Sequence, residues 1–432
     1  MIDKYTLSQV NESFTRKVLS NFNISRSKVP GEFIRNYIKV KGIYARVNKN
    51  HNKLSIKKAQ KIVKSVNTLL KKDDREFESL LPIDIFQSGG GTSINIPINE
   101  LISRYSENKL NHFDDVNMSQ SSNDTFPGVS KITTYFQIEE LLKEIEDLIA
   151  EYMRLIKETK SIQKVGRTHM QDALEIRVGD ELSAHFETLN KNRTNLEYIQ
   201  KYCLELPFGA TALGSMQNIS KEIRKDIIKE ISREYGINFK APKNYYEAVS
   251  SSGDLLKVSS AIVCCASDLL KISKDLILLS SGPKAGLNEI ILKESQKGSS
   301  IMPGKINPSI FEAICMICFK VIGNGVTIET ANQNAQLQLQ AFNPILAFTL
   351  FENIEILTRG IKTFNQKGLS NISFNKEGIR ESLENSLVYA TKYSEVLGYE
   401  RVAELYKESL TKGLDLKELI MKEVKEAEKD CK

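Results

Sequence analysis

The chain has 432 residues, enough for a large buried core and for two or three domains. Its hydrophobic (41%) and charged (26%) fractions are ordinary for a globular protein and exclude a disordered or fibrous chain. The net charge is +6, and Lys and Arg alternate with Asp and Glu, as in KEIEDLIAEYMRLIKE, so nucleic acid is not indicated as a partner.

Signal peptides and membrane-spanning helices each have a recognisable apolar pattern. The N-terminal sequence MIDKYTLSQVNESF contains no apolar core of the kind found in a signal peptide. We find no stretch that approaches the roughly 18 apolar residues of a membrane-spanning helix. We therefore expect a cytoplasmic protein without a membrane partner.

Helical periodicity dominates the chain. Apolar residues recur in steps of three and four along four segments: 55–72, 138–156, 221–235 and 254–279. The third segment closes at Gly236, a typical helix end, and the fourth is apolar around most of its circumference. Strand signals are few and short. An all-α fold of long, laterally packed helices follows.

Four polar interruptions separate the helical segments: QSGGGTSIN, QSSNDTFPG, KVGRTHMQDA and SSGPKAGLNEIILKESQKGSSIMPGKINP. Any one of them alone is ordinary turn chemistry. Rigid helical scaffolds, however, commonly carry binding and catalytic residues on such segments. The four interruptions are therefore the candidate functional segments.

The longest interruption, residues 282–308, is predicted to be a structureless functional loop that closes as a flap. Its last part places Ser299, Ser300, Lys305 and Asn307 within nine residues. Hydroxyls, a cation and an amide close together suit a carboxylate. A helix starting near Pro308 adds free N–H groups and a positive dipole end, which also favour an anion.

The segment GSSIMPGKINP resembles the GSSxMPxKxNP signature of the aspartase/fumarase superfamily of lyases. GGGTSIN, VNMSQSSND and VGRTHMQDA resemble that superfamily's other substrate-binding segments, in the same chain order. The resemblance extends from about Phe33 to about Gly413. It implies a three-domain, all-α fold with a central long-helix bundle, with domains at 1–124, 125–374 and 375–432. It also implies a homotetramer whose active sites draw on three subunits.

The resemblance also implies roles for individual residues. Ser299 is the implied general base, which takes a proton from the carbon next to a carboxylate. Lys305 and Asn307 are expected to hold that carboxylate in its aci-carboxylate form, and Glu312 to orient His169. The residues expected to bind the rest of the substrate are Thr92, Ser93, Ser121, Ser122, Asn123, Thr168, His169 and Ser300.

The implied reaction is an anti-elimination that converts a small dicarboxylate to fumarate. GTS at residues 91–93 and Asn288 in GPKAGLNEI resemble aspartases, as do CFKVIGN and QLQLQAFNP. Ser122 resembles fumarases, where aspartases more often have threonine. Deamination of L-aspartate is our first expectation. Three alternatives stay open: conversion of L-malate to fumarate and water, elimination from another substituted succinate, and a non-catalytic lyase-fold protein.

Two segments depart from both families. GATALGSMQN lacks the second glycine of the usual GTGLN, and Glu175 stands where proline is typical. No dinucleotide-binding or phosphate-binding glycine motif is present, so we expect no cofactor. Cys315 and Cys318 form a CxxC without a second ligand pair, which favours core packing over a metal site. We expect no metal.

Overall fold

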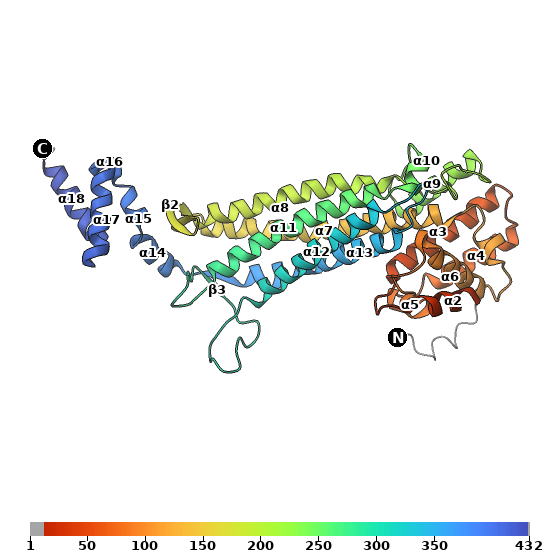
Figure 1. Ribbon diagram of the computed structural model, residues 1–432, viewed down its shortest axis with the longest axis horizontal. Coiled ribbons are helices and arrows are strands. Elements are labelled where there is room, and N and C mark those ends of the chain that lie inside the picture. The colour runs from red at the N-terminus through yellow and green to blue at the C-terminus, as the bar shows by residue number, and fades with distance from the viewer. Residues whose placement is uncertain (1–12, 431–432) are drawn as a thin grey trace. The chain divides into compact units, whose positions relative to one another are not determined.

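The computed structural model describes residues 13–430, and helices make up most of that part of the chain (Figure 1). Contacts between residues divide the chain into two compact units, each assembled from three separate stretches. Unit 1 comprises the residues up to Lys143 together with Thr194–Ala266 and Phe319–Thr358. Unit 2 comprises Glu144–Arg193, Ser267–Cys318 and the residues from Arg359 onward. The expected boundaries of three domains stay a prediction.

Short and medium-length helices open unit 1: α2 (Ser13–Asn21), α3 (Gly31–Asn50), α4 (Ile56–Leu69), α5 (Asp74–Leu80) and α6 (Thr92–Arg104). Their core contains an aromatic cluster in which the Phe33 ring centre lies 5.1 Å from Phe126 and 5.4 Å from Phe348. Offset and edge-on packing of this kind stabilises a core beyond its buried area. Ser55 caps α4 by accepting a hydrogen bond from the Lys58 N–H, so the predicted helix at 55–72 is confirmed with a slightly earlier end.

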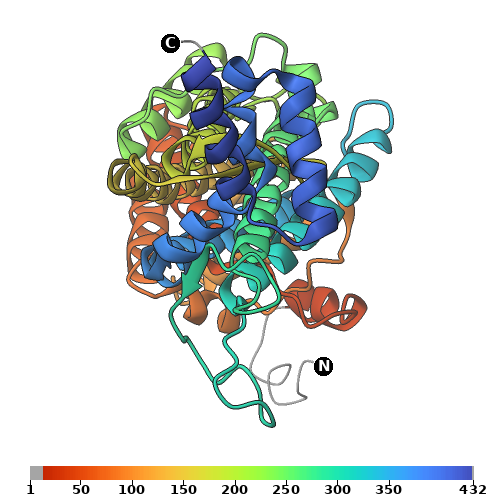
Figure 2. The same cartoon turned by 90° about the vertical axis from the view of Figure 1, so that its left-hand side faces the viewer.

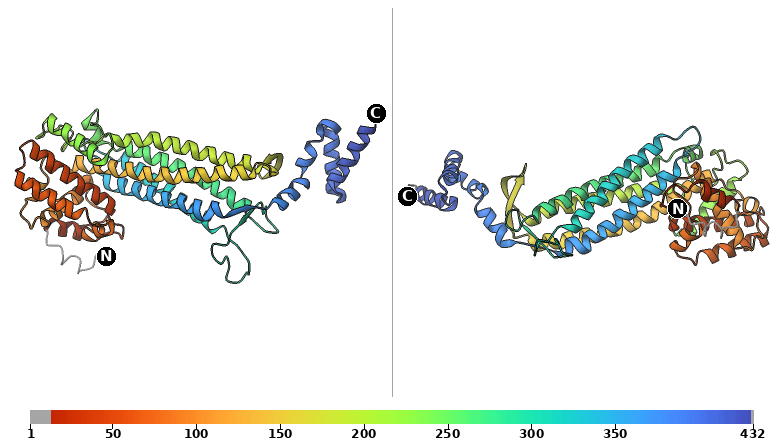
Figure 3. Two further views of the ribbon diagram at one scale, coloured as in Figure 1. Left: turned by 180° about the vertical axis from the view of Figure 1, so that it is seen from behind. Right: turned by 60° about the horizontal axis from the view of Figure 1, so that its bottom comes forward.

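Five long helices run through both units: α7 (Ser122–Thr159), α8 (Val178–Gln200), α11 (Gly253–Leu279), α12 (Ser309–Gln333) and α13 (Asn343–Thr363). Within each unit their corresponding parts lie alongside one another (Figures 1 and 3). In unit 1, Lys131 of α7 pairs with Asp254 of α11 at 2.7 Å. In unit 2, Asn192 of α8 donates to Asp268 of α11 at 2.8 Å. The all-α expectation is confirmed.

Two further helices complete unit 1: α9 (Lys221–Tyr235) and α10 (Tyr245–Ser250). Ser220 caps the start of α9, and Gly236 ends it with φ of 71°. Glycine adopts that left-handed conformation without strain, so the predicted helix end at Gly236 is confirmed. Five short turns of helix lie between the main elements: η1 (Gly89–Gly91), η2 (His112–Val116), η3 (Lys201–Leu204), η4 (Phe364–Gly368) and η5 (Leu369–Asn371).

Unit 2 contains the strands of the described chain, β1 (Gln163–Thr168) with β2 (Gln171–Arg177) and β3 (Ile290–Leu292) with β4 (Ile372–Phe374), as two antiparallel pairs. The first pair was expected to be an irregular segment, and β3 falls inside the stretch expected to be structureless. Both expectations are corrected. The segment between β3 and α12 is an extended loop, drawn in teal in Figure 2.

The C-terminal helices of unit 2 are α14 (Lys376–Glu384), α15 (Leu387–Thr391), α16 (Ser394–Leu397), α17 (Tyr399–Lys412) and α18 (Leu416–Asp430). Helices α14 and α15 pack against the β1–β2 hairpin, where Leu383 and Val388 bury Val165. Helices α17 and α18 share a small core that includes Val402 and Ile420. The hairpin is therefore held in place by residues more than 200 positions later in the chain.

Helix α12 is long and apolar enough to cross a membrane by length and composition. Its most apolar window has a mean hydropathy of 1.6, and 28% of that window is buried. The expectation that no stretch approaches this length is corrected. Glu312, Lys320 and Glu329 are spread along the helix, and a helix covered by other subunits has the same composition.

Candidate active site

Two helices of unit 1 begin side by side at the first group of candidate residues. Thr92 is the first residue of α6, and Ser121 directly precedes α7. The hydroxyl oxygens of Thr92 and Ser122 lie 3.1 Å apart and share a hydrogen bond. Gly91, with φ of 78°, allows this approach, because a Cβ there would lie 2.3 Å from the Phe126 ring. We call Thr92, Ser121, Ser122 and Asn123 the helix-start cluster.

A buried carboxylate fixes the start of α7. Asp124 accepts a hydrogen bond from the Ser121 N–H at 3.0 Å, and the Ser121 hydroxyl accepts one from the Asn123 N–H at 3.2 Å. This reciprocal arrangement is a variant of the capping box. The other Asp124 oxygen accepts from the N–H groups of Gly209 (3.1 Å) and Thr211 (2.9 Å). The ATALG stretch is thereby fastened to the helix-start cluster.

Burial raises the pKa of Asp124 to about 7, against the lowering effect of its backbone hydrogen bonds and of Lys41. Asn123 adds a second link to the same stretch by donating its side-chain amide to the Ala212 carbonyl at 2.9 Å. Ser93 is buried in the first turn of α6. The positions of the cluster's side chains are thus set by contacts within unit 1.

Beneath the cluster lies a polar network that the sequence analysis missed. The buried Lys41 of α3 donates to Asn95 at 2.5 Å and to Asn117 at 3.0 Å. Asn95 and Asn99 of α6 also donate to the Asn117 side-chain oxygen, at 3.0 and 3.2 Å. Burial holds the pKa of Lys41 well below its usual range.

In the sequence, the feature that indicates this network is a lysine at a core position of the helix. Lys41 lies four residues after Tyr37 and three before Tyr44, and all three side chains are fully buried. A polar side chain on such an apolar stripe needs partners on facing helices. The asparagines of INIPINE and DDVN supply them, but their proximity depends on how α3 and α6 pack.

A hollow of about 590 Å³ adjoins the helix-start cluster and is lined by Ser121, Ser119, Gln120 and Thr211, with Lys53 as its one cation. Its lining is rich in hydroxyl and amide groups, which bind carboxylates without adding strong counter-charges. The positive dipole ends of α6 and α7 add to that preference. The cluster is chemically suited to hold one end of a dicarboxylate.

In unit 2, Thr168 and His169 lie at the tip of the β1–β2 hairpin. His169 and Met170 form its two-residue turn with φ of 51° and 63°, while Thr168 pairs with Gln171. Both turn residues are left-handed, a conformation that Asn and Gly usually supply in this type of turn. Backbone strain of this kind is concentrated at functional sites. Because neither Asn nor Gly occupies the turn, the hairpin was not predicted from the sequence.

A buried group of ions supports this hairpin and was also missed. Glu289, which is 4% exposed, pairs with Lys164 at 2.5 Å and with Arg167 at 2.6 Å. Lys164, which is 2% exposed, also pairs with Glu181 at 2.8 Å. A buried carboxylate between two cations fixes β1 relative to the residue that directly precedes β3. In the sequence, the segments KVGR and NEI show these residues only as charges among apolar neighbours. Nothing there indicates that the charges pair with one another.

The second group of candidate residues lies on what we call the signature loop, residues 298–307. The Ser299 hydroxyl oxygen accepts hydrogen bonds from the backbone N–H groups of Ile301 (3.2 Å) and Met302 (3.0 Å). The Asn307 side chain donates to the Gly298 carbonyl at 2.8 Å. These contacts fold the loop on itself immediately before α12, which begins at Ser309 as predicted.

The remaining residues of the signature loop face outward. Ser300 and Lys305 are exposed, and Ile301 is 83% exposed. A crevice of about 20 Å³ touches Asn307, large enough for a water molecule but not for a dicarboxylate. His169 and Glu312 are likewise exposed, and no ion pair joins them within residues 13–430. Their expected pairing is not formed inside unit 2.

Within the part of the chain that the structure describes, no group of three or more His, Cys, Asp or Glu side chains is arranged to hold a metal. Cys315 and Cys318 are free and buried. The candidate residues of these segments supply hydroxyls, amides, an imidazole and lysine side chains.

Comparison with known proteins decides the family. A family model described as "Lyase" matches residues 4–323. The class II fumarate hydratase of Helicobacter pylori strain J99 is 35% identical over 415 residues, which cover 94% of this chain and 89% of that protein. The chain belongs to the aspartase/fumarase superfamily of lyases. The resemblance found in the sequence is confirmed.

Other members of the superfamily are similar to this chain to the same degree. The aspartate ammonia-lyase of Corynebacterium glutamicum is 35% identical over 419 residues, covering 94% of this chain and 79% of that protein. A crystal structure described as fumarate lyase:delta crystallin from Brucella melitensis bound to cobalt matches with a TM-score of 0.90 and 32% identity, covering 95% and 92% of the two chains. Class II fumarase from Schistosoma mansoni matches with a TM-score of 0.89 and 28% identity, covering 95% and 91%.

In this lyase, the backbone conformation is left-handed at two positions where related proteins usually have glycine. Met216 stands where the family usually has glycine and keeps a left-handed φ of 58°. Asn288, where fumarases usually have glycine, has φ of 48°. Asparagine and glycine both tolerate that conformation. The asparagine at 288 is therefore accounted for by backbone geometry, which weakens it as an indicator of substrate.

Proposed function

We propose that this lyase deaminates L-aspartate to fumarate and ammonia with Ser299 as the base. The observation that carries the proposal is the pair of backbone N–H groups directed at the Ser299 hydroxyl oxygen. A serine can remove a carbon-bound proton only as an alkoxide, and two N–H donors stabilise the negative charge on that oxygen. Lys305, six residues further along the same loop, adds a positive charge.

In the proposed reaction, deprotonation precedes the loss of ammonia. The Ser299 alkoxide takes a proton from the carbon next to one carboxylate, and the electron pair is held as an aci-carboxylate by Lys305 and Asn307. That pair then forms the carbon–carbon double bond while the carbon–nitrogen bond breaks and ammonia leaves. The proton on Ser299 passes to ammonia or solvent, which restores the alkoxide. No electron acceptor is required.

The helix-start cluster supports the binding half of the proposal. Its hydroxyl and amide groups lie at two helix N-termini and would hold the other carboxylate and the leaving group. Thr168 and His169 are proposed to complete this side of the substrate. Their strained hairpin tip fits a residue that must be held in one orientation.

Hydration of fumarate to L-malate is the second candidate. Class II fumarate hydratases are prominent among the similar proteins, and Ser122 resembles theirs. Three segments favour deamination because they resemble those of aspartases: GTS at 91–93, CFKVIGN and QLQLQAFNP. Neither assignment changes the role of Ser299, because deamination of L-aspartate and dehydration of L-malate, the reverse of hydration, both begin by removing the same kind of proton.

We further propose that the protein is a homotetramer with shared active sites. Met316, Phe319 and Val326 are 62%, 59% and 62% exposed and lie with Gly323 along one stripe of α12. Gly323 has no atom within 4 Å of where a side chain would begin. An apolar stripe of this length favours burial against another copy. A cytoplasmic location stays part of the same proposal.

The test is fumarate formation, followed by the ultraviolet absorbance of its double bond, with L-aspartate and L-malate offered separately. Turnover of aspartate alone supports the proposal, and turnover of malate alone replaces it with the second candidate. If neither reacts, a panel of substituted succinates separates another substrate from a non-catalytic protein. Light scattering after size-exclusion chromatography measures the subunit number, and a monomer would contradict the proposed assembly.

A further inference from the structure

The positive charge of this protein is concentrated in one stretch near the N-terminus. Residues 33–72 contain twelve Lys and Arg and no Asp or Glu, whereas the whole chain has a net charge of +6. The expectation that cations and anions alternate along the whole chain is wrong for this stretch. The rest of the chain is net acidic, and of these twelve side chains only Lys53 and Lys41 lie at or beneath the helix-start cluster.

Some of these cations have internal partners. Arg35 pairs with Asp74, Lys58 with Asp115 and Lys72 with Glu76, at 2.8, 2.7 and 3.0 Å. Lys41 belongs to the buried network beneath the helix-start cluster. Within residues 13–430, no carboxylate lies in ion-pair distance of the group formed by Lys49, Lys57, Lys61, Lys64 and Lys71. Among the described residues, no ion pair therefore neutralises their charge.

Three of these unpaired lysines line a groove between α3 and α4. The groove has a volume of about 580 Å³, and its lining consists of Arg46, Lys49, Ala59, Gln60, Val63, Lys64, Asn67, Thr68 and Lys71. It contains four cations, three neutral hydrogen-bonding side chains and no carboxylate. This volume is typical of small-molecule sites in proteins.

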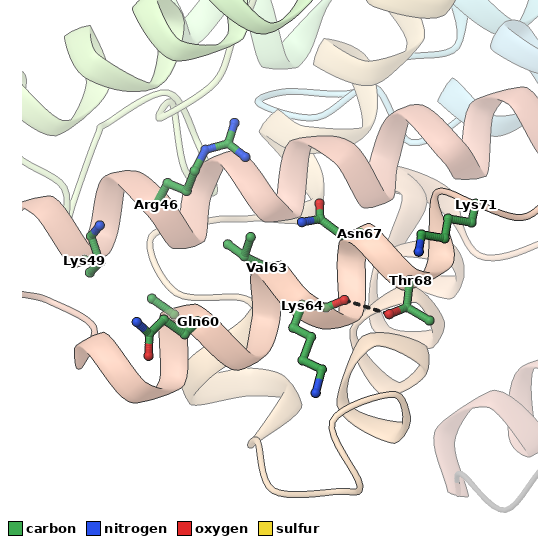
Figure 4. A pocket seen from close by; sticks show the side chains of 9 residues that line it. Arg46, Lys49, Gln60, Val63, Lys64, Asn67, Thr68 and Lys71 are labelled. Atoms are coloured by element: carbon green, nitrogen blue, oxygen red, sulfur yellow. Dashed lines mark hydrogen bonds between the residues drawn. The ribbon is translucent and has the colours of Figure 1, made fainter.

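Figure 4 shows how the side chains that line the groove lie relative to the two helices. Val63 and Asn67 of α4 point toward α3, and Arg46 and Lys49 project from α3. Lys71 lies past the end of α4, while Lys64 points to the outer side of that helix. Arg46 is partly neutralised by Glu234 at 2.7 Å, so the uncompensated charge lies mainly with the lysines.

We propose that this groove binds a small molecule that carries two or more phosphate groups. A ligand with several negative charges in a small volume matches several lysines, which bind phosphate as point charges. Asn67, Gln60 and Thr68 supply further polar groups at the groove. Ala59 and Val63 form an apolar floor that can take up an uncharged part of the ligand.

The lining argues against single-stranded nucleic acid as the natural occupant. Proteins that bind it combine a basic groove with aromatic side chains on which bases stack. No aromatic residue lines this groove. A short, highly charged ligand therefore fits the groove better than an extended strand does.

The probe is inorganic tripolyphosphate, titrated calorimetrically against the full-length protein at low ionic strength, with orthophosphate and a short single-stranded oligonucleotide as comparisons. The site variant Lys49→Gln/Lys71→Gln removes two charges that line the groove. The matched control Lys57→Gln/Lys61→Gln removes two charges from α4 that do not line it. Circular dichroism verifies that both variants are folded. Within residues 13–430, none of the four lysines forms an ion pair.

We expect tripolyphosphate to bind more tightly than orthophosphate. We also expect the site variant to weaken tripolyphosphate binding about tenfold, while the control weakens it about twofold or less. Equal weakening by the two variants would overturn the proposal, because it indicates general charge attraction. Absence of binding, or tighter binding of the oligonucleotide than of tripolyphosphate, would also overturn it. None of these readouts depends on lyase activity.

Discussion

The helix-start cluster and the signature loop carry complementary parts of the proposed chemistry but are built in different ways. The cluster lies on the first turns of α6 and α7 and is fixed by buried groups, above all Asp124 and Lys41. The hydrogen bonds recorded for the side chains of Ser299 and Asn307 stay within the signature loop, and most of its residues are exposed. The proposed binding groups are held by the core, whereas the proposed base is held by its own loop.

This difference separates two kinds of experimental effect. A substitution among the buried supports should lower the free energy of unfolding, because it leaves polar groups without partners. A substitution on the exposed loop should change turnover and leave stability nearly unaltered. The four predictions below test that separation, from the largest expected effect to the smallest.

Replacing Glu289 tests whether this buried carboxylate stabilises the fold. Glu289 directly precedes β3, which is followed by the exposed loop. Glu289→Ala leaves Lys164 and Arg167 without their shared carboxylate and should lower the free energy of unfolding by about 3–5 kcal/mol. Urea denaturation measures the change. Glu181→Ala, which removes the more exposed partner of Lys164, should cost clearly less. Equal losses would mean that Glu289 is not the main anchor.

Replacing Lys305 tests the loop itself. Lys305→Ala should lower kcat/KM by roughly 100-fold, about 3 kcal/mol of transition-state stabilisation, because the developing negative charge loses a cation. The melting temperature should stay the same, since the side chain is exposed. Lys297→Ala, an exposed lysine just outside the signature loop, serves as the control and should retain activity. A large drop in melting temperature for Lys305→Ala would break the comparison between the two regions.

Asp124 provides the corresponding test in the helix-start cluster. Asp124→Ala should lower the free energy of unfolding by about 2 kcal/mol, because the N–H groups of Gly209 and Thr211 lose their acceptor. The matched control is Asp114→Ala, on the exposed side of η2, for which we expect a change within about 0.5 kcal/mol. Chemical denaturation at neutral pH measures both. An unchanged free energy of unfolding would show that water replaces the carboxylate as the acceptor for these N–H groups.

The smallest expected effect concerns pH. Burial raises the pKa of Glu32 in α3 to about 7, partly offset by a hydrogen bond from Gln137. The folded state thus holds this proton more tightly than the unfolded state. Its stabilising contribution is complete below the ordinary glutamate pKa and disappears as the pH rises to about 7. Glu32→Gln should therefore reduce the loss of stability between pH 5 and pH 8, measured by thermal melts. An unaltered pH dependence would contradict the raised pKa.

The long helices and the start of α12 could be predicted from the sequence because both depend on local patterns, namely apolar periodicity and the residues at helix ends. The β1–β2 hairpin could not, because His169 and Met170 occupy a turn that favours Asn and Gly. Motif resemblance supplied the candidate residues themselves. It did not supply Lys41 or Glu289, whose partners lie on elements brought together only by tertiary packing.

The groove between α3 and α4 shows a further limit of reading the sequence. The net charge and the mixed charges of one helix suggested that cations and anions alternate along the chain. Residues 33–72, however, contain no acidic residue. The lysine spacing was visible in the sequence, but the groove exists only because α4 packs beside α3. Counting the charges in a window about as long as two neighbouring helices reveals such a stretch from the sequence alone.

The central claim is that Ser299, on an exposed loop, is the base of a fumarate-forming elimination. The most direct measurement compares the rate of fumarate formation by the wild type and by Ser299→Ala, on the substrate that the wild type turns over, together with their melting temperatures. We predict a loss of about 1,000-fold or more in kcat at an unchanged melting temperature. A variant that retains the wild-type rate would contradict the claim.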